Sequence, residues 1–218
     1  MSMGVLIMAR APRPGEVKTR LEPLLGPGGC ARLQAELIRH PSHWVAASAP
    51  ASWLAFTPAD ARQEVRRLVR ATVSLFAQEG QDLGERLGHA TELAFRAHRG
   101  ALAVIGTDAP ELGPVHVRFA ERALAEGHDT CLIPTLDGGY ALIALTRPTP
   151  LAFELPSEAW GGPDVLDLTL IALRAAGRST AVLEPVRDLD TPEDARYVAA
   201  DPRCPETIRR ALEDVMLL

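Results

Sequence analysis

The stretch "GVLIMARAPRPGEVKTR", residues 4–20, joins a wholly apolar run to a loop that is rich in proline and basic residues. The apolar part, 4–9, has the composition of a β-strand buried on both faces, which is typical of a parallel sheet covered by helices. In the loop, Gly15 permits a close backbone approach, and the cationic side chains of Lys18 and Arg20 could both bind an anion. Taken alone, the loop is interpreted equally well as a phosphate cradle or as a solvated surface turn.

Strands and helices are expected to alternate along the rest of the chain. Apolar runs predict further strands at 52–57, 72–78, 101–106, 129–135, 140–145 and 180–185. Helical spacing of apolar residues lies between them, at 26–40, 58–70, 82–100, 114–126, 163–176 and from 191 onward, while 40–51 is expected to be a loop. This alternation predicts an α/β fold, with a mixed, mainly parallel sheet and helices on both faces, in a single domain over 1–218.

Composition excludes several classes of protein. The 218 residues carry a formal net charge of -5, without the basic excess of a duplex-binding protein, so no nucleic-acid partner is expected. Three scattered cysteines, Cys30, Cys131 and Cys204, lack metal-ligand spacing and fit reduced thiols, which favours a cytoplasmic location. No apolar run reaches the ~18 residues of a membrane span.

Polar residues follow the predicted strands, where the carboxyl ends of a parallel sheet place ligands. Asp108 comes directly after the strand at 101–106, and Asp190 precedes the last predicted helices. Two carboxylates from separate strand ends suit a Mg²⁺ ion that bridges phosphates. On local evidence alone, a cap of the turn before Pro110, formed by Asp108 or Thr107, is slightly favoured, whereas Thr191 and Asp194 have the pattern of a helix capping box.

Two glycine pairs allow a structural and a functional interpretation. "LDGGY", residues 136–140, is suited to a hairpin turn, or to a substrate that approaches the backbone. "AWGGPDVL", residues 159–166, is suited to a helix start, while Trp160 could line a sugar or base pocket. GxxxxGK[ST], GxGxxG and GxSxG are all absent, which excludes a P-loop, a dinucleotide fingerprint and a nucleophile elbow.

Taken together, the motifs resemble a known bacterial family. "MARAPRPGEVKTRLEPLLG", "QEGQDLGERL", "VIGTDAPEL", "LDGGYALIAL", "AWGGPDVL" and "RDLDTPEDA" occur in the order of the DUF2064 family, also called transferase 1, rSAM/selenodomain-associated. The resemblance covers about residues 3–200. It implies a GT-A-type, Rossmann-like fold of the nucleotide-diphospho-sugar transferase superfamily, over one such domain at 1–218. A single Asp108 stands where glycosyltransferases of this fold usually carry D-x-D.

The resemblance also implies roles for individual residues. The first loop is similar to that of 2-phospho-lactate guanylyltransferases and, more distantly, of molybdenum-cofactor nucleotidyltransferases, where it wraps a nucleotide. By this resemblance, the nucleotide and its phosphates would be bound by Ala9, Arg10, Pro14, Gly15, Lys18, Arg20, Gln78 and Asp82. The sugar or acceptor would be bound by Asp137, Gly138, Gly139, Tyr140 and Trp160. Asp108 and Asp190 would hold Mg²⁺ or Mn²⁺, and Lys18, Arg20 and Asp108 would be the catalytic residues.

The function expected from these residues is that of a transferase. It would use a nucleotide-activated donor, a nucleoside-diphosphate sugar first, in a metal-assisted, glycosyltransferase-like reaction with a small-molecule acceptor. The alternative is a nucleotidyltransferase that joins a nucleoside triphosphate to a phosphorylated acceptor and releases pyrophosphate. A noncatalytic nucleotide-binding protein remains a third interpretation, and a homodimer is an open alternative for the assembly.

Overall fold

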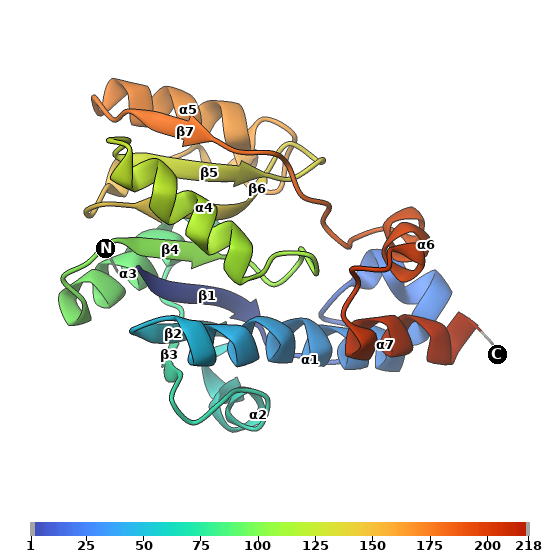
Figure 1. The fold of residues 1–218 in the computed structure, drawn as a ribbon. Coiled ribbons are helices and arrows are strands. Elements are labelled where there is room, and N and C mark those ends of the chain that lie inside the picture. Colours follow the sequence, from blue (N-terminus) through green and yellow to red (C-terminus); the bar gives the residue numbers. More distant parts are fainter. Residues whose placement is uncertain (1–2, 217–218) are drawn as a thin grey trace.

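The computed structural model describes residues 3–216, and its centre is one seven-stranded sheet with the order β3-β2-β1-β4-β6-β5-β7. Figure 1 shows the sheet between its helices. The strands are β1 Gly4–Arg10, β2 Ser52–Thr57, β3 Ser74–Ala77, β4 Leu102–Ile105, β5 Thr130–Pro134, β6 Tyr140–Leu145 and β7 Thr180–Val182. Only β6 runs antiparallel to its neighbours, β4 and β5. The predicted α/β fold with a mixed, mainly parallel sheet is confirmed.

Helices cover both faces of the sheet, as predicted. They are α1 Glu22–Ser48, α2 Arg62–Arg66, α3 Leu83–Ala97, α4 Pro114–Ala125, α5 Val165–Ala175, α6 Pro192–Ala200 and α7 Glu206–Met216. One buried apolar cluster joins α1, α2 and α4 to the sheet, and a second joins α3 and α5 to its other face. In Figure 1, α1 and α4 accordingly lie in front of the sheet and α3 behind it.

The prediction of a loop at 40–51 was wrong, because α1 continues to Ser48. Pro41 lies inside this helix, and it is buried together with Ser42 and Val45. Burial of these side chains against the sheet outweighs the cost of a proline, which removes one helical hydrogen bond. The break occurs earlier, at Gly26, whose φ of 64° and ψ of 166° kink the helix near its start.

A third apolar cluster lies beyond the edge of the sheet, between α1, α6 and α7. Its fully buried members include Leu33, Leu189 and Ile208. Figure 1 shows α6 and α7 beside the N-terminal half of α1, away from the strands. Packing in this cluster fixes the segment that carries Asp188 and Asp190. Among the described residues, no helix combines the length and apolar character needed to cross a membrane.

The chain changes direction across the sheet at β1. It proceeds from β1 to β2 and β3 on one side, and then returns to β4 on the other. β1 therefore pairs in parallel with both β2 and β4. The crevice outside the carboxyl ends of such strands is the usual ligand site of open α/β sheets.

Candidate functional site

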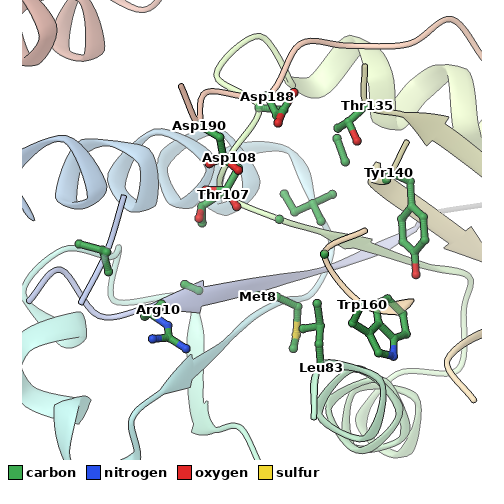
Figure 2. A pocket seen from close by; sticks show the side chains of 18 of the residues that line it. Met8, Arg10, Leu83, Thr107, Asp108, Thr135, Tyr140, Trp160, Asp188 and Asp190 are labelled. Atoms are coloured by element: carbon green, nitrogen blue, oxygen red, sulfur yellow. The ribbon is translucent and has the colours of Figure 1, made fainter. Parts of the chain in front are cut away.

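A pocket of about 550 Å³ lies at this change of direction, a volume in the range of small-molecule sites. It is formed by the carboxyl ends of β1 and β4, the start of β6, and the loops that contain residues 16–20, 135–139, 160–162 and 188–190. Figure 2 shows Asp108, Asp188 and Asp190 together at one end, with Met8, Leu83 and Trp160 across from them. Four basic and five acidic side chains line the pocket.

Lys18 lies at the acidic end of the pocket. Its ammonium group donates a hydrogen bond to the Asp108 carboxylate, to Asp190 Oδ1 at 2.8 Å and to the carbonyl of Leu189 at 2.9 Å. The Lys18 side chain is only 5% exposed, whereas the side chains of Asp108 and Asp190 are 54% and 36% exposed. Burial opposes the charge on Lys18, but the two carboxylates outweigh it and raise the pKa of the ammonium group.

Backbone contacts hold the two acidic loops together. The Leu189 amide donates to the carbonyl of Asp108 at 2.8 Å, which joins the loop after β4 to the segment before α6. That segment ends in the predicted capping box, where Thr191 Oγ1 accepts from the Asp194 amide at 3.2 Å. Asp108 and Asp190, 82 residues apart in the sequence, are therefore brought to one point by the main chain as well as by Lys18.

Asp188 is a further acidic residue of this site and is itself only 8% exposed. Burial, followed by the negative charges of Asp137 and Asp190, raises the pKa of Asp188 to about 6. On the neighbouring loop, Asp137 Oδ1 accepts hydrogen bonds from Thr135 Oγ1 at 2.5 Å and from the Gly139 amide at 3.1 Å. This side of the pocket is thus rich in acceptors for hydroxyl groups.

Most residues predicted for the site line the pocket, while four lie outside its lining. Those that line it are Ala9, Arg10, Lys18, Arg20, Gln78, Asp108, Asp137, Gly139, Tyr140, Trp160 and Asp190. Those outside it are Pro14, Gly15, Asp82 and Gly138.

Several of these residues have structural partners that account for them. Asp82 is the N-cap of α3, where its Oδ1 accepts from the Glu85 amide at 2.9 Å and its Oδ2 from the Ser157 hydroxyl. Gln78 donates its side-chain amide to the carbonyls of Ala9 at 3.1 Å and Ala55 at 2.9 Å. These bonds leave the amide oxygen of Gln78 as its acceptor for a ligand.

Gly138 and Gly84 allow segments of the chain to pack closely against each other. Gly138 has a φ of 93°, and a Cβ atom added there would meet the Pro163 carbonyl oxygen at 2.0 Å. The Leu166 amide, near the start of α5, donates to the Gly138 carbonyl at 2.9 Å. Gly84 likewise leaves room for Trp160, because a Cβ atom at Gly84 would lie 2.6 Å from the indole Nε1. These contacts fix the position of Trp160 along the apolar wall of the pocket.

Some residues of the pocket carried no local signal in the sequence. Gln34, on α1, is 3% exposed and donates to the Arg10 carbonyl at 3.2 Å and to Thr107 Oγ1 at 3.4 Å. Arg86, on α3, donates to the Gly80 carbonyl at 3.1 Å. Both lie inside helices that carry other polar residues, so only the fold reveals that these two reach the pocket. Asp188 did have a signal, since the capping box leaves it without a role.

The donor set at the acidic end fits a hard divalent cation in its chemistry, because it consists of carboxylate and carbonyl oxygens. The position between these oxygens is occupied by the Lys18 ammonium group. Within residues 3–216, no three or more His, Cys, Asp or Glu side chains are arranged as a metal site. The two predicted ligands, Asp108 and Asp190, do lie together, and Lys18 is the cation they share.

Comparison with known proteins supports the family resemblance. Residues 42–161 match the model of the family described as "Uncharacterized protein conserved in bacteria (DUF2064)". A proposed nucleotide-diphospho-sugar transferase from Desulfovibrio desulfuricans G20 is 27% identical, with a TM-score of 0.87 over 98% of this chain and 95% of that one. No curated protein sequence matches significantly. The similarity to the Desulfovibrio protein confirms the prediction that the chain is a transferase.

More distant structures share the fold. The CMP:2-keto-3-deoxy-manno-octonic acid synthetase complexed with CTP is 14% identical, with a TM-score of 0.56 over 90% of this chain and 97% of that one. Rv0371c from Mycobacterium tuberculosis H37Rv, in complex with manganese, is 16% identical, with a TM-score of 0.51 over 90% and 97%. At these identities the likeness concerns the fold alone.

Proposed function

The chain belongs to the DUF2064 family, and we propose that it transfers a group from a nucleotide-activated donor, with a nucleoside-diphosphate sugar as the donor class. The observation that carries this proposal is the convergence of Lys18, Asp108 and Asp190 in one pocket at the carboxyl edge of the sheet. The similarity to a proposed nucleotide-diphospho-sugar transferase at 27% identity supports the same class.

In this proposal, the basic loop after β1 binds the diphosphate. Arg10 and Arg20 line the pocket with exposed side chains, so their guanidinium groups can donate paired hydrogen bonds to phosphate oxygens. Positive charge beside the leaving phosphate stabilises the negative charge that develops when the bond to the sugar breaks. Arg13 has a different task, because it is tied to Glu64 at 2.8 Å and to Asp60 at 3.1 Å. It therefore anchors the loop to the region of α2.

The rest of the pocket suits the sugar, the base or the acceptor. Met8, Leu83 and Trp160 form an apolar wall, against which a flat ring can stack. Across from it, Asp137 and Asp188 offer carboxylate oxygens to hydroxyl groups. A Mg²⁺ or Mn²⁺ ion held by Asp108 and Asp190 would neutralise charge on the diphosphate. We propose the whole of 1–218 as one nucleotide-diphospho-sugar transferase-like domain, because one sheet, with the helices and loops attached to it, forms the pocket.

A second candidate is nucleotidyl transfer, favoured by the basic residues at positions 10, 18 and 20, since a triphosphate requires more positive charge than a diphosphate. The product that is released distinguishes the two candidate reactions. The purified protein would be incubated with nucleoside triphosphates and sugar phosphates, and separately with nucleoside-diphosphate sugars, in each case with Mg²⁺ or Mn²⁺. Release of a nucleoside diphosphate supports sugar transfer, and release of pyrophosphate supports the second candidate.

Binding is tested before turnover. A thermal-shift screen with nucleotides identifies the ligand, and calorimetry then compares Arg20→Gln with wild type. Loss of a charged hydrogen bond, about 1.5–3 kcal/mol, should weaken binding roughly ten- to a hundred-fold. The control is Arg174→Gln, because Arg174 is exposed on α5 and does not line the pocket. If no nucleotide stabilises the protein, or if both variants bind like wild type, the proposal is wrong.

A further inference from the structure

Lys18 is the only lysine in the chain, among 22 arginines. An ammonium group differs from a guanidinium group in being a compact charge with three donors. Here three acceptors converge on it: the Asp108 carboxylate, Asp190 Oδ1 at 2.8 Å and the Leu189 carbonyl at 2.9 Å. All three donors are therefore used within the protein. In this arrangement Lys18 has no hydrogen bond left for a phosphate.

The backbone of Lys18 is held in place independently of these bonds. Its φ of 50° makes it the only residue other than glycine with a positive φ among residues 3–216. The Lys18 carbonyl accepts from the Leu21 amide at 2.8 Å and from Cys30 Sγ at 3.3 Å. Backbone strain of this kind is concentrated at functional sites. Because the main chain is fixed, the ammonium group can leave the carboxylates only through rotation of its four-carbon side chain.

The same oxygens cannot serve Lys18 and a divalent cation together. Two carboxylates and a carbonyl are hard donors that suit Mg²⁺ or Mn²⁺, but the ammonium group already lies between them and carries charge of the same sign. Asp108 and Asp190 are 54% and 36% exposed, so they remain accessible from the pocket while Lys18 beneath them is almost covered.

We propose that Lys18 is a resident counter-ion that a divalent cation displaces from Asp108 and Asp190, and that the displaced ammonium group then binds a phosphate of the donor. The second half rests on the proposed function, whereas the first half requires no nucleotide. The exchange makes metal and nucleotide binding favour each other, since each stabilises the arrangement in which Lys18 has left the carboxylates. Such coupling is reciprocal in the two affinities.

The first experiment is titration of Mn²⁺ into metal-free protein without nucleotide, followed by calorimetry and by the electron paramagnetic resonance of free Mn²⁺. Lys18→Met removes the competing charge at similar length, and the exposed carboxylates can remain hydrated. It should bind Mn²⁺ at least ten-fold more tightly than wild type. Adding Asp190→Asn to Lys18→Met should abolish that gain.

Arg20→Met is the matched control, because it removes one positive charge from the same loop and the same pocket without an ion pair to either carboxylate. An equal gain in Arg20→Met would mean that general electrostatics, and not exchange, explains the effect. Mn²⁺ affinity in Lys18→Met that is equal to or weaker than in wild type would overturn the proposal. Thermal melting confirms that each variant is folded.

The second experiment uses the single lysine as its own reporter. Reductive methylation with ¹³C-formaldehyde, followed by peptide mapping, separates Lys18 from the terminal amine and measures its rate of modification. Lys18 should react slowly without metal, at least five-fold faster with saturating Mg²⁺, and slowly again once a nucleotide is added. No increase with Mg²⁺ would overturn the exchange. An increase that no nucleotide reverses would overturn the phosphate-binding half alone.

Discussion

Gly138→Ala separates the two interpretations of the "LDGGY" turn. The added Cβ would lie 2.0 Å from the Pro163 carbonyl oxygen and 2.6 Å from its carbonyl carbon, so the loop before α5 would have to move. Such overpacking costs about 1–3 kcal/mol, and the left-handed backbone costs a non-glycine residue about 1–2 kcal/mol more. Movement of the loop also endangers the 2.9 Å bond from the Leu166 amide to the Gly138 carbonyl, a loss of about 1 kcal/mol.

Together these terms predict a loss of about 3–6 kcal/mol in the free energy of unfolding. For a chain of this length, that corresponds to a fall in Tm of roughly 6–24 °C. The matched control is Gly177→Ala, because Gly177 has a φ of 66° but no atom within 4 Å of an added Cβ. Gly177→Ala introduces only the cost of the left-handed backbone, so its Tm should fall by only about 2–8 °C.

Scanning calorimetry and urea titration of both variants measure the difference. If Gly138→Ala is no less stable than Gly177→Ala, the packing argument is refuted. If it is equally stable and yet loses nucleotide binding, Gly138 serves the approach of a substrate and not the contact between loops.

Three further changes test other parts of the structure. Gln34→Leu removes the bonds to the Arg10 carbonyl and Thr107, so it should lose about 1–3 kcal/mol of stability and weaken nucleotide binding, unlike Gln63→Leu at an exposed position. Asp82→Ala should lower Tm by a few degrees through loss of the α3 cap, with nucleotide affinity unchanged by calorimetry. Burial lowers the pKa of His116, whose Nδ1 accepts from the Gly113 amide at 3.1 Å. The contribution of neutral His116 to stability is therefore fully present above the ordinary histidine pKa, and it is lost as the pH falls from about 7 to 5. His116→Gln should reduce the fall in Tm over this pH range.

The sequence predicted the fold well because the inner strands of the sheet are buried on both faces. Runs such as 101–106 have no competing helical pattern, and proline or glycine bounds them. The failure at 40–51 has a physical cause, since Pro41 and a polar composition locally favour a loop. Burial of Val45 and its neighbours against the sheet reverses that preference. Tertiary packing of this kind cannot be read from a window of ten residues.

The sequence predicted which edge of the sheet carries the pocket, but not which charged side chains pair with one another there. Strand ends placed Lys18, Asp108 and Asp190 at the same side of the sheet, because parallel strands end together. The sequence could not assign a partner to each charge. A lysine in a basic loop suggests a phosphate ligand, and two aspartates suggest a metal, but their joint presence makes each available to the other. The ion pairs of Lys18 with Asp108 and with Asp190, the latter at 2.8 Å, show which charges meet in the structure.

The same contacts constrain how the pocket can work. If the pocket binds a nucleotide as proposed, a phosphate must attract Lys18 away from three acceptors, because the charge of this nearly buried side chain is already neutralised. Arg10 and Arg20 also line the pocket and are exposed, so they would be available to a diphosphate without breaking an ion pair. In the proposed exchange, Asp108 and Asp190 would hold a divalent cation in place of Lys18, and Lys18 would be released toward the phosphates. Positive charge beside the reacting phosphate would then rise only when both ligands are present, and the metal-bound donor would be turned over in preference to the free nucleotide.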